Sequence, residues 1–318
     1  MSGTPEDQAI PHPQVQAYLN RLAQANVGAL HTFTPAQARA GWHRQIAMLA
    51  EPEPVAHVEN RTIPGADGPI PVRIYTPHGD GPFPLLMFFH GGGFVLGDLD
   101  THDGLCRSLA NGAGCLVVAV DYPRAPEHKF PAAPDACFTA TEWAADHAAE
   151  FHGDATRIAV AGDSAGGNLA TVVARMARDQ GGPPLRHQLL IYPDLDFRRT
   201  NVSITEFAGK YGNITRAGQH WFMDNYLTTE REKLDPRVSP LLAPDLTGLP
   251  ATHIITAEYD ALRDEGEQYG HRLTEAGVPT TITRYPGMIH EFLRHPFDDS
   301  AKARHDAATI LAEAFTRT

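Results

Sequence analysis

The sequence has few cysteines, and their spacing excludes several classes of protein. Cys106, Cys115 and Cys137 are the only three in 318 residues, and no two form a C-x-x-C pair. A disulfide framework is therefore excluded, and neither a structural zinc site nor a thioredoxin-like site is expected. Cys115 and Cys137 are predicted to be small residues of the core.

Basic residues are also scarce, which limits the classes of partner that the protein is expected to bind. Lys and Arg number 26 against 38 Asp and Glu, giving a formal net charge of -12. Nucleic acids and anionic membranes attract basic surfaces, so neither is expected as a partner.

Long apolar runs are absent as well. No stretch approaches the ~18 apolar residues that cross a bilayer. The start of the chain, "MSGTPEDQAIPHP", is acidic and proline-rich and lacks the basic and apolar regions of a secretory signal. We therefore expect a soluble, cytoplasmic protein without membrane insertion.

Shorter apolar runs are present, and they predict an α/β fold. Six of them are typical of strands covered on both faces: "PLLMFFH", "CLVVAVDY", "RIAVAGDS", "HQLLIYP", "THIITAEYD" and "TTITRYP". Helical patterns lie at about 135–149, 165–179, 264–276 and 299–315. This alternation predicts a mostly parallel, doubly wound sheet with helices on both faces. Ahead of it, "VAHVENRTI" and "IPVRIYTP" predict an antiparallel pair.

Two segments depart from this alternation. Residues 1–50 predict two amphipathic helices, which either cover core or form a lid over a site. Residues 196–235 form a polar and aromatic insertion between two core strands, where a connection is normally short. We expect both segments to pack together as a helical cap, leaving 51–195 and 236–318 as the core. Aromatic residues of these segments are candidates for the pocket lining or for the interior of the cap: Tyr18, Phe33, Phe207, Tyr211 and Trp221.

A G-x-S-x-G motif spans Gly162 to Gly166, directly after an apolar run and before a helical pattern. This context is typical of a nucleophile elbow. Side chains at 162 and 166 would collide with the neighbouring strand and helix, so glycine is needed there. We predict that Ser164 is a catalytic nucleophile at the positive end of the following helix.

Three consecutive glycines follow another apolar run, in "LLMFFHGGGF". Ordered glycine is entropically costly, so we expect their bare N–H groups to approach a ligand. Acyl transfer needs such donors, each of which contributes ~3 kcal/mol to stabilising the oxyanion. We predict an oxyanion hole formed by Gly92, Gly93 and Ala165, with Gly91 shaping the loop and His90 anchoring it.

A nucleophilic serine requires a base and an orienting carboxylate. Asp260 directly follows an apolar run, at the strand end where doubly wound sheets place their sites. Glu258 is the weaker alternative. Three further acidic residues lie in the first turn of the next predicted helix, where the helix dipole accounts for them: Asp264, Glu265 and Glu267.

His290 lies in "MIHEFLRH", which is one residue away from the H-E-x-x-H signature of zinc peptidases. That signature needs its second histidine at i+4, where this chain has Arg294. His295 at i+5 would be turned about 140° away on a helix. We therefore predict that His290 is the base of a triad with Ser164 and Asp260, and that no metal is bound.

Together, "HGGGF", "DYPRAPEHKFPAAPDA", "GDSAGG", "YDALRDEG" and "GMIHEF" resemble the bacterial hormone-sensitive lipase family of carboxylesterases, in its GDSAG branch. The resemblance extends from about residue 55 to the C-terminus. It implies an α/β-hydrolase core with a helical cap and cofactor-free hydrolysis of small-molecule esters with short or medium acyl chains. It allows a homodimer without requiring one. It implies triad roles for Ser164, Asp260 and His290 and oxyanion roles for Gly92, Gly93 and Ala165.

The sequence departs from the family pattern at two places. Glu291 stands where the family usually has glycine, and we expect its carboxylate to face solvent; turned inward, it would raise the pKa of His290. The family motif D-Y-R-L-A-P-E here contains Pro123 and Arg124, so no contact of the missing arginine is carried over.

Two other functions remain compatible with the motifs. An amidase or peptidase would use the same site, because function resides in the pocket and not in the scaffold. A small-molecule receptor on this fold would have lost catalysis and is expected to lack a member of the triad, whereas this chain has all three.

Overall fold

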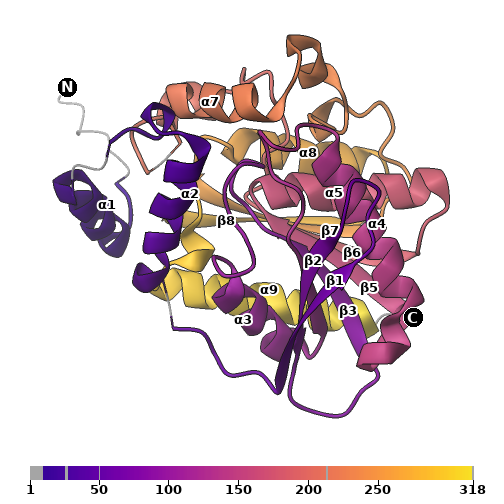
Figure 1. The fold of residues 1–318 in the computed structure, drawn as a ribbon. Helices are drawn as coiled ribbons and strands as arrows, with labels where there is room; N and C mark the ends of the chain where they lie inside the picture. Colours follow the sequence, from indigo (N-terminus) through magenta and orange to yellow (C-terminus); the bar gives the residue numbers. More distant parts are fainter. Residues whose placement is uncertain (1–9, 26–27, 50, 213, 317–318) are drawn as a thin grey trace, which may run out of the picture.

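A central sheet organises the computed structural model, which describes residues 10–25, 28–49, 51–212 and 214–316. Within these residues the sheet has eight strands in the order β1-β2-β4-β3-β5-β6-β7-β8 (Figure 1). β1 pairs with β2 and β2 with β4 antiparallel, and every other neighbouring pair is parallel. The predicted mostly parallel sheet and its antiparallel start are confirmed. The bounds are β1 His57–Ile63, β2 Ile70–Thr76, β3 Phe83–Phe89, β4 Leu116–Val120, β5 Gly153–Asp163, β6 Leu185–Ile191, β7 Ala251–Tyr259 and β8 Thr280–Ile289.

Helices cover both faces of the sheet. One face carries α4 (Ala132–Asp146), α5 (Ala165–Gln180) and α8 (Arg263–Glu275). The other carries α3 (Asp103–Ala113) and α9 (Asp298–Thr316). Of the described helices, none is both long enough and apolar enough to cross a bilayer.

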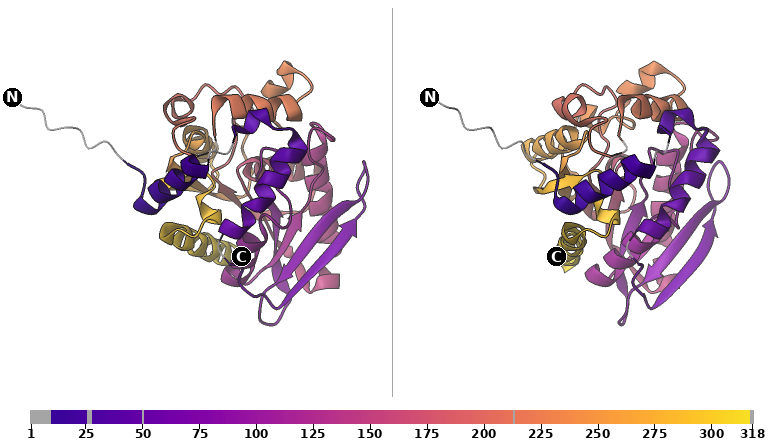
Figure 2. Two further views of the ribbon diagram at one scale, coloured as in Figure 1. Left: turned by 60° about the vertical axis from the view of Figure 1, so that its left-hand side comes forward. Right: turned by 90° about the vertical axis from the view of Figure 1, so that its left-hand side faces the viewer.

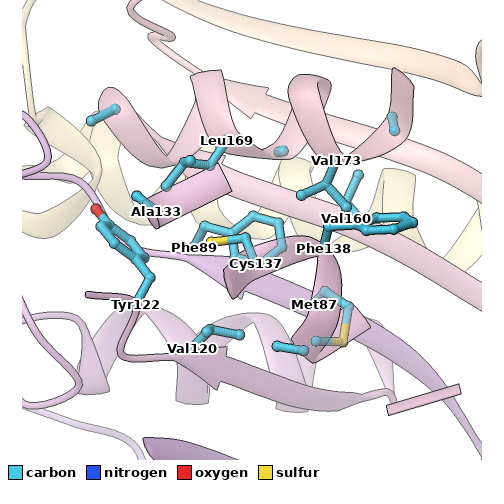
Figure 3. Packing of buried hydrophobic residues seen from close by; sticks show 14 of the residues in the cluster. Met87, Phe89, Val120, Tyr122, Ala133, Cys137, Phe138, Val160, Leu169 and Val173 are labelled. Carbon is cyan, nitrogen blue, oxygen red and sulfur yellow. The ribbon is translucent and has the colours of Figure 1, made fainter. Parts of the chain in front are cut away.

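Strand β3 shows why its apolar run has no polar alternation. Met87 and Phe89 belong to the cluster under α4 and α5, where Figure 3 shows Phe89 beside Cys137. Leu86 and Phe88, which alternate with them along the strand, belong to the cluster under α3 and α9. Successive side chains of a strand alternate between faces, so a sheet buried on both sides needs apolar residues throughout.

Helix α3 has no counterpart among the predicted helices. It begins after His102, whose side chain makes no capping bond, and it contains the weak helix former Gly112. A Cβ at Gly112 would lie 2.6 Å from Ala308 Cβ of α9. The glycine that weakens the sequence pattern thus allows α3 and α9 to pack closely.

Short helices precede and interrupt the core. The N-terminal ones are α1 (Pro13–Ala25), η1 (Leu30–Thr32), α2 (Pro35–Arg44) and η2 (Ile46–Met48), and the connection from β6 to β7 contains α6 (Val202–Phe207), α7 (Arg216–Tyr226), η4 (Glu230–Leu234) and η5 (Pro240–Leu242). α2 begins at a capping box between Thr34 and Gln37. Residues 1–9, 26–27, 50 and 213 of the predicted cap lie outside the described residues.

The two predicted cap segments contact each other. Figures 1 and 2 show α2 and α7 at the same end of the sheet, and η1, just ahead of α2, contacts α7. Trp221 of α7 donates a hydrogen bond from Nε1 to the carbonyl oxygen of Phe33, 3.2 Å away, just ahead of α2. Segments nearly two hundred residues apart therefore meet through a side chain from one and the backbone of the other.

Candidate active site

The turn between β5 and α5 positions Ser164. Its backbone has φ 55° and ψ -118°, a conformation that L-residues rarely adopt. A Cβ at Gly166 would lie 1.8 Å from the carbonyl oxygen of Phe89, and one at Gly162 would lie 2.3 Å from Gly166. The steric reason predicted for the two glycines is therefore present in the structure.

Three side chains form a hydrogen-bonded chain at this end of the sheet. His290 Nε2 lies 2.9 Å from Ser164 Oγ, and His290 Nδ1 lies 2.6 Å from Asp260 Oδ2. They follow the carboxyl ends of β5, β7 and β8, which parallel pairing brings to one edge. Asp260 is 1 % exposed, whereas Ser164 and His290 remain 8 % and 9 % exposed. Both ring nitrogens of His290 are occupied, which leaves none for a metal ion.

Neighbouring charges act on His290. Burial lowers the pKa of His290, but the charge and hydrogen bond of Asp260 outweigh burial, with smaller contributions from Glu291 and Asp163, so that the pKa is raised. The site is thus built to accommodate a positive charge on the imidazole when it accepts a proton.

The competing carboxylates are bonded elsewhere. Glu258 accepts a hydrogen bond from Gly287 N (2.7 Å), and Glu267 accepts one from Arg284 Nε (2.8 Å). Asp264 accepts one from Ser203 N, 2.8 Å away. Of the acidic candidates considered, Asp260 is the one bonded to His290.

Glu265 lies in the first turn of α8, as predicted, but other contacts also hold it, and Glu267 lies beyond that turn. The Glu265 side chain is fully buried and accepts hydrogen bonds from the N–H groups of Leu195 (2.6 Å) and Asp196 (3.2 Å). Arg199 Nη1 lies 3.6 Å from the same carboxyl oxygen. Glu265 therefore anchors the start of the predicted insertion to α8.

The loop after β3 is fixed by hydrogen bonds along its length. Asp163 Oδ1 accepts a bond from Gly91 N at 2.8 Å, and Tyr122 donates from its hydroxyl to His90 O at 2.7 Å. The His90 ring stacks on Tyr122 with centroids 4.2 Å apart, and its Nδ1 is 2.8 Å from Gly91 O. His90 thus contacts the loop backbone and no member of the hydrogen-bonded chain.

The next glycines have backbone conformations that favour glycine, with φ 119° at Gly92 and 59° at Gly93. Between described residues, no hydrogen bond is donated by the N–H groups of Gly92, Gly93 or Ala165. A Cβ at Gly93 would lie 2.4 Å from the ring of Phe222 on α7. The three N–H groups are therefore available to a ligand, beside an aromatic ring that was not among the predicted residues.

Two arginines that sequence reasoning did not assign also hold this loop. Arg39 of α2 donates to Val95 O (2.8 Å) and Ala125 O (2.7 Å), and it pairs with Glu127. Arg124 donates to Gly97 O. The difference between "DYPRAPE" and the family motif could have indicated a role for Arg124, whereas no local sequence pattern indicated one for Arg39.

Glu291, which was expected to face solvent, is only partly exposed. Its side chain is 18 % exposed, and Oε2 lies 3.7 Å from Nη1 of the buried Arg294. The backbone at Glu291 has φ 66°, in the left-handed region. The Glu291 carboxylate thus lies beside a buried cation, next to the proposed base.

The predicted aromatic candidates fall into two groups. Tyr18 packs on His295 with centroids 4.5 Å apart, while Phe207 and Tyr211 pack on Tyr259 of the core. These three connect the N-terminal segment and the insertion to the core. Phe33 and Trp221 instead belong to the contact between α7 and the N-terminal segment, next to Phe222.

Comparison with known proteins gives concordant matches. The model of a family described as alpha/beta hydrolase fold matches residues 86–294. Carboxylic ester hydrolase LipN of Mycobacterium tuberculosis is 44% identical over 262 residues, which cover 79% of this chain and 69% of LipN. An arylesterase of Saccharolobus solfataricus is 36% identical over 284 residues, covering 89% of this chain and 92% of that protein.

Solved structures resemble the whole chain. A hyperthermophilic esterase from Pyrobaculum calidifontis superposes with a TM-score of 0.93 at 40% identity, covering 96% of this chain and 98% of that one. A thermostable esterase from Pseudomonas putida superposes with a TM-score of 0.93 at 38% identity, covering all of both chains.

Proposed function

Because the chain belongs to the alpha/beta hydrolase fold family, we propose that it is a serine carboxylesterase acting on esters with short to medium acyl chains. The fold class and family resemblance expected from the motifs are confirmed. The observation that carries the proposal is the hydrogen-bonded chain from Asp260 through His290 to Ser164. The similarity to proteins named as esterases supports an ester as the substrate.

The proton path follows from this chain of bonds. His290 removes the proton of Ser164 through Nε2 as Oγ attacks the ester carbonyl. Asp260 accepts the Nδ1–H bond, which holds the tautomer and stabilises the imidazolium. His290 then protonates the leaving alcohol, and a water molecule repeats the cycle on the acyl-enzyme.

The oxyanion is assigned to the N–H groups of Gly92, Gly93 and Ala165, which donate to no other described residue. Gly91 shapes the loop by its bond to Asp163, and His90 anchors the loop through its stacking on Tyr122. No cofactor or metal enters these steps.

A helical cap made of residues 1–50 and 196–235 would cover this site, on a core of 51–195 and 236–318. The bond from Trp221 to Phe33 supports a single cap rather than two separate segments. The contact of Phe222 with Gly93 supports its location over the oxyanion loop.

The first test is hydrolysis of p-nitrophenyl esters from acetate to palmitate. We expect the rate to peak between butyrate and octanoate and to fall by at least about 10³-fold in Ser164→Ala, because the nucleophile is lost. Ser108→Ala, a serine of α3 outside the site, is the control and should retain activity. Near-normal hydrolysis by Ser164→Ala would refute the assignment.

The alternative functions give different results in the same assay. An amidase or peptidase would also turn over an anilide of the same acyl group, whereas an esterase would turn over only the ester. A receptor without catalysis would turn over neither. A cytoplasmic location and a homodimer stay predictions, which cell fractionation and sedimentation would test.

A further inference from the structure

Glu291 directly follows the proposed base in a backbone conformation that suits glycine. Its φ of 66° and ψ of 8° lie in the left-handed region, where a residue other than glycine, asparagine or aspartate costs about 1 kcal/mol or more. A strained residue beside a catalytic group raises the question of what its side chain does.

The carboxylate of Glu291 lies against a buried cation. Glu291 is 18 % exposed, Arg294 is 5 % exposed, and Oε2 is 3.7 Å from Nη1. This distance is too long for a direct hydrogen bond, so the interaction is electrostatic. Water and salt screen such a covered pair less than an exposed one.

Arg294 has few other partners in the described part of the chain. Nη2 donates to Thr101 O at 3.2 Å, Nε lacks a hydrogen-bond partner, and the guanidinium lies over the ring of Trp42 at 5.1 Å. Trp42 belongs to α2, at the edge of the predicted cap. The segment after His290 is thus connected to the N-terminal helices through this arginine.

The other titratable groups around the site divide into charged and neutral ones. Burial raises the pKa of Tyr18 to about 12 and raises that of Tyr192, so both hydroxyls are neutral. Burial lowers the pKa of His102, which then donates to Asp163 as a neutral ring. Asp163 stays ionised, because its hydrogen bond from His102, the charge of Arg294 and the N–H of Gly91 favour the carboxylate over the effect of burial and lower its pKa.

Three carboxylates therefore act on His290, namely Asp260, Glu291 and Asp163, and Arg294 lies beside the second and lowers the pKa of the third. Asp260 is bonded to the ring, and Asp163 is bonded to the oxyanion loop. Glu291 and Arg294 are bonded to neither the ring nor the nucleophile. Their charges can be changed without removing a hydrogen bond of the catalytic chain.

We propose that Glu291 and Arg294 form a pair of positioning residues that sets the proton affinity of His290. The carboxylate favours the imidazolium that forms when Ser164 attacks, and Arg294 opposes this effect while tying the loop to Trp42. The inference rests on the proposed function, because it takes His290 as the base.

The pair predicts opposite effects for its two members. Glu291→Gln leaves the Arg294 charge unopposed, which disfavours the imidazolium and moves the acid limb of activity to lower pH. Arg294→Gln leaves the Glu291 charge unopposed, which moves the acid limb to higher pH. A substitution that merely loosened the loop would have no reason to give shifts of opposite sign.

The test is the pH dependence of kcat/KM for p-nitrophenyl butyrate, which reports ionisation of the free enzyme. Below the wild-type midpoint, we expect Glu291→Gln to keep about threefold more of its own plateau than the wild type, and Arg294→Gln about threefold less. Normalising to each plateau removes differences in the amount of folded protein. Arg294→Lys keeps the charge and should return the limb toward its wild-type position.

Glu59→Gln on β1 is the matched control, because it removes one carboxylate from the opposite edge of the sheet and should leave the limb unchanged. The proposed role of the pair would be overturned if the acid limb shifted in the same direction in both variants, or did not shift in Glu291→Gln. Absence of turnover in the wild type, or retained turnover in Ser164→Ala, would instead overturn the proposed function.

Discussion

Gly166 is a single residue on which the geometry of the nucleophile turn depends. A Cβ there would lie 1.8 Å from Phe89 O, a backbone atom that cannot move without disturbing β3. We expect Gly166→Ala to lower the free energy of unfolding by about 3 kcal/mol or more and to abolish ester hydrolysis. Urea denaturation followed by circular dichroism would measure the loss.

Gly41→Ala in α2 is the control for this change, since the nearest atom, on the Arg44 side chain, would be 3.6 Å away. Alanine is the better helix former, so a gain of up to about 1 kcal/mol is expected. Equal stability of the Gly166→Ala and Gly41→Ala proteins would contradict the steric account of the elbow.

At the residue scale, the sequence predicts what local covalent geometry dictates and misses what distant side chains decide. The need for glycine at 162 and 166 follows from the sharpness of one turn. The position of the Glu291 carboxylate beside Arg294 and the left-handed backbone at Glu291 are not visible in composition. The role of Asp260 was predictable because this residue directly follows a strand. The burial of Glu265 was not, because it depends on a hydrogen bond from the Leu195 backbone.

At the scale of elements, apolar runs predicted the central strands well because both faces of the sheet are covered. Helix α3 was not predicted, because its packing on α9 requires a glycine that weakens the helical pattern. The links between the N-terminal helices and the core join residues far apart in sequence. No periodicity reports such links, so α2 could be predicted as a helix but not as a support of the oxyanion loop.

Arg39 is the residue through which α2 would exert that support. Its guanidinium bonds to Val95 O and Ala125 O, and Val95 N in turn bonds to Gly92 O. We expect Arg39→Ala to lower kcat for p-nitrophenyl butyrate about tenfold with a smaller change in KM, because a displaced oxyanion donor costs transition-state binding. Steady-state kinetics at saturating ester would measure it.

Glu127→Gln separates the loop contact from the ion pair. It removes the charge that pairs with Arg39 and leaves both carbonyl bonds in place. We expect a much smaller loss of kcat than in Arg39→Ala. Because Arg39 lowers the pKa of Glu127 to about 2, the ion pair persists over the whole working range of pH. A loss as large as that of Arg39→Ala would assign the effect to the ion pair.

At the scale of the whole molecule, the carboxyl ends of β5, β7 and β8 meet at one edge, and helices from two separate stretches of chain meet above the loop after β3. The order of Ser164, Asp260 and His290 along the chain was enough to predict the first arrangement, because parallel strands share an edge. The second depends on contacts such as Trp221 with Phe33, which only the folded chain brings together.

The same burial that shapes the site should make the molecule sensitive to acid. His295 is 6 % exposed between Tyr18 and Phe297, and burial followed by the charge of Arg294 lowers its pKa to about 3. Burial likewise lowers the pKa of His253 to about 4. Both rings are neutral when folded and titrate near pH 6.5 when unfolded, so stability is complete above about pH 6.5 and falls as the pH decreases toward these values.

Each such histidine removes up to about 1.4 kcal/mol of unfolding free energy per pH unit. We expect His295→Phe, which keeps an aromatic ring against Tyr18 but cannot take up a proton, to flatten the decline measured by urea unfolding between about pH 6.5 and pH 4. His305→Gln on α9 is the control, because it removes an exposed histidine of the same kind, and it should keep the wild-type slope. Parallel slopes for His295→Phe and the wild type would mean that His295 accepts its proton without unfolding, and the acid sensitivity would then lie with His253 or the carboxylates.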